Sequence, residues 1–248
     1  MHRAVLITDA NTRLGAHLAR GLAKDGWHIC IHYNHSDSEA EILAGDISRA
    51  GGSASIVKAN VSADEDVKWL VENCRRDLHA LINSPSTFRT ERAQDFTTEM
   101  PSLHRALNLD ALTRIAADFA EQAETGASII NMTDQPAVKS NALILGNSYA
   151  TEGIDLATKS MARRFAPKVR VNSIDIGPMT ENTPKARGKV DVKAQATSSG
   201  EGCTQEGILQ SVRYLLSAKA VTGQMICLDG GQGSGRLRPD VAIGARYE

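Results

Sequence analysis

The segment from Thr8 to Gly15 has the residue types of a phosphate-binding loop. A β-branched run, Ala4–Thr8, ends at this point, and an amphipathic stretch over 14–25 follows at once. A turn between the first strand and the first helix of a parallel sheet presents free N–H groups and the helix dipole to a pyrophosphate. Gly15 alone is also compatible with a simple tight turn, so this interpretation depends on the rest of the chain.

A second segment, 146–153 (GNSYATEG), contains a residue suited to proton transfer. Tyr149 lies near the start of a helix predicted over 148–166. A lysine four residues after a tyrosine would share its helix face and favour its ionisation, but position 153 is glycine. Lys159 is ten residues from Tyr149, nearly three helical turns away. We therefore interpret Tyr149 as a partly buried tyrosine near the helix start rather than as an enzyme's acid.

Strand and helix patterns alternate along the whole chain. Short β-branched runs predict strands at Ala4–Thr8, His28–Tyr33, Ala54–Val57, Ala80–Asn83, Ala127–Met132, Val169–Ile174 and Gln224–Leu228. Helices are predicted at 14–25, 37–50, 62–77, 101–123, 148–166 and 204–218, and the fifth should bury Ile154, Ala157, Met161 and Phe165. Apolar strands that alternate with helices are typical of a parallel sheet covered on both faces. We expect a doubly wound α/β fold with a seven-stranded parallel sheet, a Rossmann fold.

The rest of the chain gives no sign of a second domain. It contains no internal repeat and no low-complexity linker, so we expect one domain over residues 1–248. The polar segment 178–201 follows the sixth strand, where loops of this architecture lie over the ligand, and is predicted to be a flexible lid. Residues 233–248 form a tail to which no role is assigned.

Composition and charge limit the possible partners. The formal net charge of the 248 residues is -1 and aromatic residues make up 4%, which disfavours nucleic acid as a partner. The four cysteines lack the spacing of a metal site, so reduced structural thiols and no metal are expected. The N-terminus has no room for a signal peptide, and no apolar run reaches membrane-spanning length. These features predict a cytoplasmic protein without a membrane partner.

The order of these segments resembles the short-chain dehydrogenase/reductase family. That family's phosphate loop reads Thr-Gly-x-x-x-Gly-x-Gly, and its pteridine reductases carry arginine at the middle glycine. The pteridine reductase variant is matched by Thr8, Arg13, Leu14 and Gly15. Asp9 replaces the first glycine, and although aspartate tolerates positive φ, its charge near a pyrophosphate would cost about 1 kcal/mol. The resemblance, which covers residues 4 to about 232, implies an oxidoreductase with a nicotinamide cofactor.

The resemblance favours NADP(H) over NAD(H). NAD enzymes of this layout place an acidic side chain at the end of the second strand. This chain has Tyr33, Asn34, His35 and Ser36 there, which is similar to the His-Tyr-x-Arg-Ser run of pteridine reductases with His35 in the arginine position. His35 and Ser36, together with Arg13, are expected to hold the 2′-phosphate. Alternatively, these polar residues only begin a helix, with Ser36 as its N-cap.

Three further segments match cofactor-binding segments of the family. Asn60 and Val61 fall beside the adenine, with asparagine in place of the family's aspartate, and Asn keeps an acceptor oxygen. Asn83 and Ser84 end the fourth strand, next to the expected position of the nicotinamide ribose. Gly177 follows the sixth strand, where the family has Pro-Gly. The segments Arg-Val-Asn and Asp-Gly-Gly near the C-terminus also match, and they imply architecture rather than chemistry.

The positions of the family's catalytic tyrosine and lysine carry Asn147 and Thr151. Two counts agree on this register, one forward from Asp134 and one back from Arg-Val-Asn at 170–172. Neither Asn147 nor Thr151 titrates near neutrality. Asp134, which matches an aspartate of pteridine reductases, is the remaining proton source in register, or else a turn residue after the strand. Asn108 falls at the family's relay asparagine, or is an ordinary helix residue.

Two main functions remain open. The first is an NADPH-dependent reductase of a pteridine-like or other small carbonyl or imine substrate, without the usual Tyr-x-x-x-Lys mechanism. The second is an inactive family member that serves as a structural or regulatory subunit. A ligand sensor that binds NADP without turnover is a third possibility. Family members assemble through the helices that match 101–123 and 148–166, so we expect a homo-oligomer, a dimer or tetramer, or a hetero-oligomer with an active relative.

Overall fold

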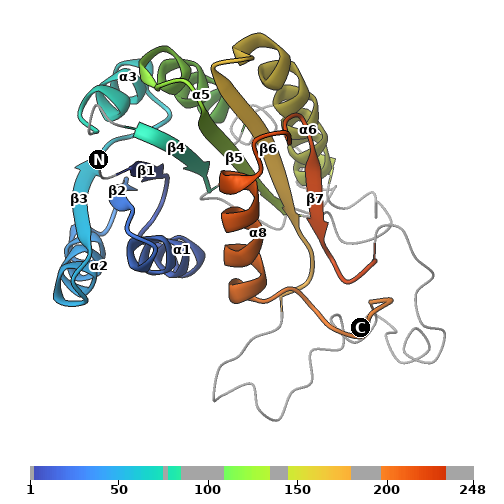
Figure 1. Cartoon of the computed structure of the whole chain (residues 1–248), viewed down its shortest axis with the longest axis horizontal. Helices are drawn as coiled ribbons and strands as arrows, with labels where there is room; N and C mark the ends of the chain where they lie inside the picture. Colours follow the sequence, from blue (N-terminus) through green and yellow to red (C-terminus); the bar gives the residue numbers. More distant parts are fainter. Residues whose placement is uncertain (1–2, 75–77, 85–108, 135–144, 180–196, 233–248) are drawn as a thin grey trace.

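The seven strands form one parallel sheet in the order β3-β2-β1-β4-β5-β6-β7 (Figure 1). This computed structural model describes residues 3–74, 78–84, 109–134, 145–179 and 197–232. The strands are β1 (Ala4–Ile7), β2 (His28–Tyr33), β3 (Ser53–Lys58), β4 (Leu78–Asn83), β5 (Ala127–Asp134), β6 (Val169–Ile176) and β7 (Met225–Leu228). The predicted fold class and all seven predicted strands are confirmed. β2 has the predicted bounds, and β5 and β6 each extend two residues further.

Helices cover both faces of this sheet. They are α1 (Arg13–Lys24), α2 (Asp37–Arg49), α3 (Asp64–Glu72), α5 (Ala111–Gln122), α6 (Leu145–Phe165) and α8 (Gln205–Ser217). The helix predicted over 62–77 is shorter, because Asn73 ends α3. Residues 101–108 of another predicted helix lie outside the described part of the chain. The alternation of strand and helix thus predicts every one of these elements, and the differences are in their ends.

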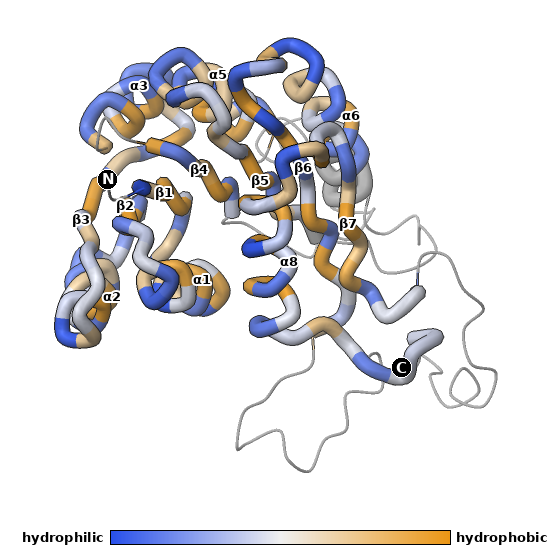
Figure 2. Tube along the Cα trace, viewed as in Figure 1, coloured by the Kyte–Doolittle hydropathy of each residue, from blue (hydrophilic) through white to orange (hydrophobic). Residues whose placement is uncertain are grey.

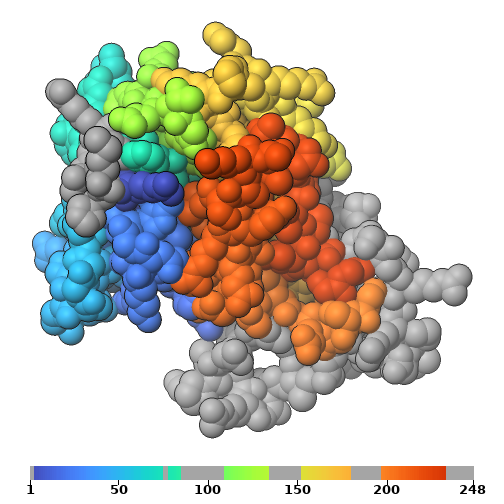
Figure 3. All heavy atoms as spheres, in the orientation of Figure 1, coloured from blue at the N-terminus to red at the C-terminus, as the bar shows by residue number. Residues whose placement is uncertain are grey.

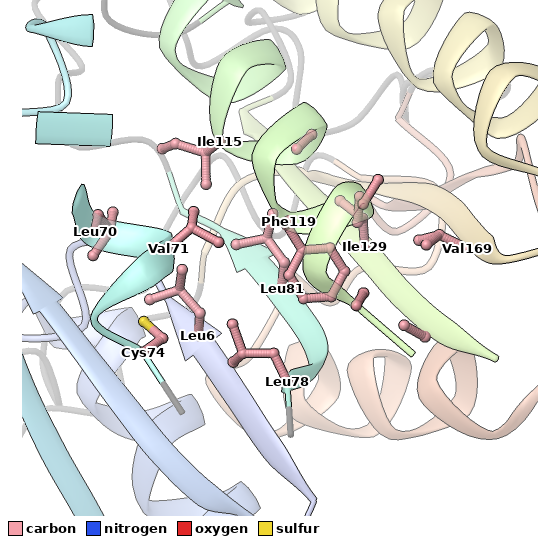
Figure 4. Close-up of a cluster of buried hydrophobic side chains, with 14 of the residues drawn as sticks. Leu6, Leu70, Val71, Cys74, Leu78, Leu81, Ile115, Phe119, Ile129 and Val169 are labelled. Carbon is pink, nitrogen blue, oxygen red and sulfur yellow. The ribbon is translucent and has the colours of Figure 1, made fainter. Parts of the chain in front are cut away.

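Two apolar clusters hold the layers together, one on each face of the sheet. Adjacent residues of β1 point to opposite faces, so Leu6 packs with α3, α5 and α6, whereas Val5 and Ile7 pack with α1, α2 and α8. Phe119 of α5 is fully buried against Leu81 in the first cluster (Figure 4). The central strands are largely hydrophobic along their length (Figure 2). In α6 the predicted face is confirmed, with Ile154 and Met161 buried and Ala157 and Phe165 packed on the same cluster.

α8 packs beside α1 on one face of the molecule (Figure 3). The contact is close at Gly21, where a Cβ atom would lie 2.3 Å from Leu209 Cδ2. Arg170 of β6 holds the other end of α8, because its guanidinium donates to the carbonyl oxygens of Leu215 and Leu216. Carbonyl groups at a helix C-terminus lack partners within the helix, so this arginine satisfies them. The Arg-Val-Asn match of the sequence is therefore architectural, as expected.

The strand order reverses at β1, which lies between β2 and β4. In open parallel sheets, ligands bind outside the carboxyl ends of the strands at such a reversal. The Thr8 N–H donates to the Ile82 carbonyl at 3.0 Å, which carries the pairing of β1 and β4 one residue beyond β1. The fold therefore places the loop after β1 where a dinucleotide binds in this architecture.

The lid predicted over 178–201 is described only at its two ends. Its last residues are tied to the loop after β7: the Ser199 N–H donates to the Gly230 carbonyl at 2.8 Å, and Ser198 Oγ donates to the Gly231 carbonyl at 3.1 Å. Residues 180–196 and the tail 233–248 lie outside the described residues, so the flexible lid stays a prediction. Among the described helices, none has the length and apolar character needed to cross a membrane.

Candidate functional site

The loop between β1 and α1 keeps its turn although it lacks the first glycine. Asp9 has a φ of 48°, in the left-handed region that favours glycine. α1 begins after Thr12, whose side-chain oxygen accepts the Gly15 N–H at 3.3 Å. A Cβ atom on residue 15 would lie 2.6 Å from the Asp9 carbonyl oxygen, so only glycine allows the helix to start this close to the turn. The helix N-terminus therefore faces the place where a phosphate group would bind.

His32 of β2 fixes the backbone of Asp9. The Asp9 N–H donates to His32 Nδ1 at 3.1 Å, and His32 Nε2 lies 3.1 Å from the Ala59 carbonyl oxygen. Because a carbonyl only accepts, Nε2 carries the proton and Nδ1 is the acceptor. Burial lowers the pKa of His32, while the Asp9 carboxylate and the Ala59 bond act in the opposite direction. A neutral His32 thus links the loop, β2 and the segment after β3.

The turn between β2 and α2 is bonded to the same loop. Asn11 Nδ2 donates to the His35 carbonyl at 3.0 Å. Ser36 is the N-cap residue of α2, as the alternative expected, but it adopts a φ of 67° and its side chain makes no capping hydrogen bond. The Ser36 carbonyl instead accepts the Glu39 N–H at 3.1 Å. Among the described residues, two that are not glycine have a positive φ, Asp9 and Ser36. Both lie at the expected cofactor site.

The residues expected around the 2′-phosphate differ in their exposure. Arg13, His35 and Ser36 are exposed, and Asn34 is half-buried, whereas Tyr33 is buried. The side chains of Arg13 and Ser36 are therefore accessible to a ligand, whereas Tyr33 packs inside the fold. Leu14 is half-buried at the start of α1 and packs on the apolar cluster behind the loop.

The segment after β3, expected beside the adenine, forms a turn of its own. Asn60 Oδ1 accepts the Ser62 N–H at 3.1 Å, and the Asn60 N–H donates to Asp66 Oδ2 at 2.9 Å. Val61 is half-buried and packs on the apolar cluster under α3. The Asn60 side chain is exposed and keeps its NH₂ group and one lone pair for another partner.

At the centre of the sheet, buried polar side chains join the strands to α6. Thr8 Oγ1 accepts the Ser84 N–H at 2.8 Å. Asn83 Nδ2 donates to Asn131 Oδ1 at 3.0 Å, and Asn131 Nδ2 donates to Thr158 Oγ1 at 2.9 Å. Asn83 Oδ1 has no partner among the described residues although its side chain is buried. An unpaired buried acceptor is costly, so this atom is suited to a donor that arrives with a ligand.

Gly177 has a packing role after β6. Its N–H donates to the Leu228 carbonyl at 3.1 Å, and a Cβ atom here would lie 2.5 Å from Asp229 Cα. Any side chain would force apart the ends of β6 and β7. The sequence match at Gly177 is therefore explained by the close approach of two backbones, and its contact with a cofactor stays a prediction.

The turns of α6 show which positions face the sheet. Thr158 faces it, because its hydroxyl is bonded to Asn131. With 3.6 residues per turn, positions 151 and 147 lie about two and three turns earlier on that face. Position 149 is about 200° away from position 147. The assignment of the family's tyrosine and lysine positions to Asn147 and Thr151 stays a prediction.

Two described residues argue against a shifted register that would use Tyr149. Such a shift would give the lysine position to Gly153, but a Cβ atom there would lie 3.0 Å from Leu109 Cδ2, towards the start of α5. Lys159, ten residues after Tyr149, donates to Asp155 Oδ2 at 2.6 Å, one turn earlier. Neither position offers a lysine ammonium beside Tyr149.

The assignments of the proposed catalytic residues stay predictions. Asp134 is the last residue of β5 and pairs in register with Ile176, so it lies at the carboxyl end of the sheet as expected. Asn147 and Thr151 lie within the first two turns of α6. Asn108 lies outside the described residues.

Asp175 of β6 is a buried acid that the sequence analysis did not single out. Its side chain is 5% exposed, and Thr133 Oγ1 donates to Asp175 Oδ1 at 2.7 Å. Burial raises the pKa of Asp175, and the carboxylates of Asp229 and Asp155 raise it further, against the effect of the Thr133 bond. The sequence carried one sign of this buried acid, an aspartate inside the largely apolar strand β6, whose sequence is VRVNSIDI.

The fold and the loop after β1 define a dinucleotide-binding α/β protein, and comparison with known proteins specifies its family. A sequence model described as enoyl-(acyl carrier protein) reductase matches residues 10–232. The chain belongs to the short-chain dehydrogenase/reductase family. The family expected from the sequence motifs is therefore confirmed.

Relatives of known structure or sequence match nearly the whole chain. An uncharacterised oxidoreductase of Methylorubrum extorquens is 27% identical, over 92% of this chain and 97% of its own length. The FolM alternative dihydrofolate reductase 1 of Brucella canis, solved with NADP, is 27% identical, has a TM-score of 0.84, and the match covers 97% of each chain. The FolM protein of Brucella suis, also solved with NADP, is 27% identical with a TM-score of 0.85, and the match covers 96% of this chain and 98% of that one.

The raised pKa of Asp175 predicts a specific pH dependence of stability. The pKa of Asp175 has its ordinary value in the unfolded chain and is raised in the folded protein. The free energy of unfolding therefore falls as the pH rises from the ordinary pKa to the raised one. Asp175→Asn keeps the acceptor for Thr133 and should unfold at higher urea than the wild type at pH 7, with the difference vanishing at low pH. Asp46→Asn is the control of opposite sign, because Arg20 lowers the pKa of Asp46. A lower midpoint for Asp175→Asn at pH 7 would contradict this account.

Proposed function

We propose that the chain is an NADP(H)-dependent oxidoreductase that reduces a pteridine-like or other small carbonyl or imine substrate. The observation that carries the proposal is the Asp9 backbone, held at a φ of 48° by the bond to His32. This bond keeps the phosphate loop in shape where the usual glycine is missing. The 27% identity to an alternative dihydrofolate reductase solved with NADP supports both the cofactor and the substrate class.

In this proposal the chain's residues bind and orient the reactants, and NADPH supplies the hydride. The N-terminus of α1 and Arg13 bind the pyrophosphate and 2′-phosphate charges. Asn83 offers its unpaired Oδ1 to a donor at the centre of the site. Asn147 and Thr151 can hydrogen-bond but cannot titrate near neutrality, so a proton must come from Asp134 or from water. Since each proton-transfer group contributes about 10²–10⁴ in rate, turnover is slow compared with that of relatives that keep tyrosine and lysine.

A pH profile of turnover tests this mechanism. With NADPH and a dihydropterin, we expect slow loss of absorbance at 340 nm that decreases as the pH rises from about 4 to about 7, because an aspartate acid must be protonated. Asp134→Asn should lower the rate by about 10²-fold or more. Tyr149→Phe is the matched control and should leave the rate unchanged. Loss of activity in Tyr149→Phe alone would show that the register is wrong, and no turnover at any pH would favour the second function below.

The second candidate function is that of an inactive structural or regulatory subunit, which would act through the surface of α5 and α6. A groove of about 800 Å³ runs between the two helices, lined mainly by Leu109, Thr113, Arg114, Gly153, Leu156 and Ala157. Leu156 is 68% exposed at its edge. We propose that two copies of the chain, or this chain and an active relative, pair through this groove. Such pairing is compatible with either function.

Leu156→Glu tests the pairing. Pairing would bury this exposed side chain at the edge of the groove, and a carboxylate there would have to be desolvated, so the dimer should weaken by about tenfold. Sedimentation velocity over a range of concentrations would measure the change. Ile42→Glu on α2, which replaces another exposed apolar residue, should leave the assembly unchanged. A wild-type protein that sediments as a monomer would exclude the pairing.

Asp9→Asn tests the cost of the charge in the phosphate loop. Asparagine tolerates the left-handed conformation and removes the carboxylate, so NADPH should bind about fivefold more tightly, which corresponds to about 1 kcal/mol. Calorimetric titration would measure the difference, with Asp46→Asn as the control for a remote surface charge. Weaker binding by Asp9→Asn would mean that the carboxylate contributes a bond that the site needs.

A further inference from the structure

An ion pair joins the start of α2 to the carboxyl end of β3 beside the expected 2′-phosphate site. Lys58 Nζ lies 2.9 Å and 3.2 Å from the two carboxylate oxygens of Asp37. Lys58 pairs in register with Tyr33, and its ammonium lies 5.9 Å from the centre of the tyrosine ring. The bond to Asp37 raises the pKa of Lys58, so the lysine is cationic at neutral pH.

The position of this pair follows from contacts already described. Asp37 is the first residue of α2 and directly follows Ser36, on the turn that Asn11 joins to the phosphate loop. Lys58 is the last residue of β3 and directly precedes Ala59, whose carbonyl oxygen is bonded to His32. The pair therefore lies on the same edge of the sheet as the phosphate loop, among residues joined to that loop by hydrogen bonds.

The charges of the pair have opposite consequences for the two nicotinamide cofactors. A free carboxylate at Asp37 would repel a 2′-phosphate and would accept a hydrogen bond from the ribose hydroxyl of NAD. Lys58 neutralises this carboxylate. The two side chains are 56% and 58% exposed, and ion pairs this exposed are weakly held. A phosphate, with higher charge and three acceptor oxygens, can therefore replace Asp37 as the partner of the ammonium.

We propose that Lys58 is a specificity-determining residue that binds the 2′-phosphate of NADP(H) and exchanges Asp37 for it. The proposal rests on the proposed NADP(H)-dependent function of the same site. His35 stands where pteridine reductases carry arginine, and Lys58 supplies a permanent cation from the neighbouring strand. Tyr33, buried beneath the ammonium, supports the lysine from the sheet. While Lys58 is present, its ammonium favours the binding of NADP(H). When Lys58 is removed, the free Asp37 carboxylate repels the 2′-phosphate and favours the binding of NAD(H).

Calorimetric titration of the full-length protein with NADPH and with NADH tests the proposal. Lys58→Met should weaken NADPH binding by about tenfold and should strengthen NADH binding, because the freed Asp37 carboxylate can accept a bond from the ribose hydroxyl of NADH. Lys58→Arg keeps the charge and should stay within about threefold of the wild type for NADPH. Asp37→Asn removes the competing carboxylate and should strengthen NADPH binding. Lys68→Met is the matched control, because Lys68 pairs with Glu72 at 3.8 Å on the surface of α3.

The outcomes separate this proposal from the one on which it rests. If the wild type binds neither cofactor, the proposed function fails and this inference with it. If the wild type prefers NADPH and Lys58→Met keeps the same preference, only the role of Lys58 is overturned. A Lys58→Met protein that loses both cofactors equally, with Lys58→Arg equally impaired, would show a structural role for Lys58 and would also overturn the proposal.

Discussion

The hydrogen bond from the Asp9 N–H to His32 Nδ1 is the interaction on which the cofactor site depends. It is possible only because His32 is neutral and donates its other ring proton to the Ala59 carbonyl. Through it, the phosphate loop keeps a left-handed residue that is not glycine, and α1 can start directly behind the loop. The same imidazole connects the loop to β2 and β3, so the phosphate, ribose and adenine parts of the site share one support.

Cofactor binding and proton transfer place different requirements on the chain. Binding depends on backbone shape and a few charges, and a substitution such as aspartate for glycine at residue 9 is compensated by one hydrogen bond. Proton transfer depends on a titratable side chain at a particular position, and the proposed register gives two such positions to Asn147 and Thr151, which do not titrate near neutrality. The buried polar links from Asn83 through Asn131 to Thr158 join the strands of this part of the fold to α6.

The sequence predicts the fold well because the strand and helix periods are local properties, and β2 was predicted to the residue. It also predicts the turn at Asp9, since the tolerance of aspartate for positive φ is a property of one residue. It missed the role of His32, the buried acid Asp175 and the pairing of Lys58 with Asp37. Each of these depends on the register between strands distant in the sequence, which no local pattern contains. Ser36 does stand at the N-cap of α2, but with a positive φ and without a capping bond from its side chain, which the local sequence did not indicate.

The most direct test is hydrogen–deuterium exchange of the unaltered protein with and without NADPH. If the loop held by His32 binds the cofactor, backbone amides of residues 9–15 and 34–37 should exchange more slowly with NADPH present, and NADH at the same concentration should have a much smaller effect. An NADPH concentration on the order of millimolar exceeds the dissociation constant of a tight cofactor site by about a thousandfold or more. Unchanged exchange in both segments at that concentration would contradict cofactor binding and would favour a role for the fold as a subunit that acts through its surfaces.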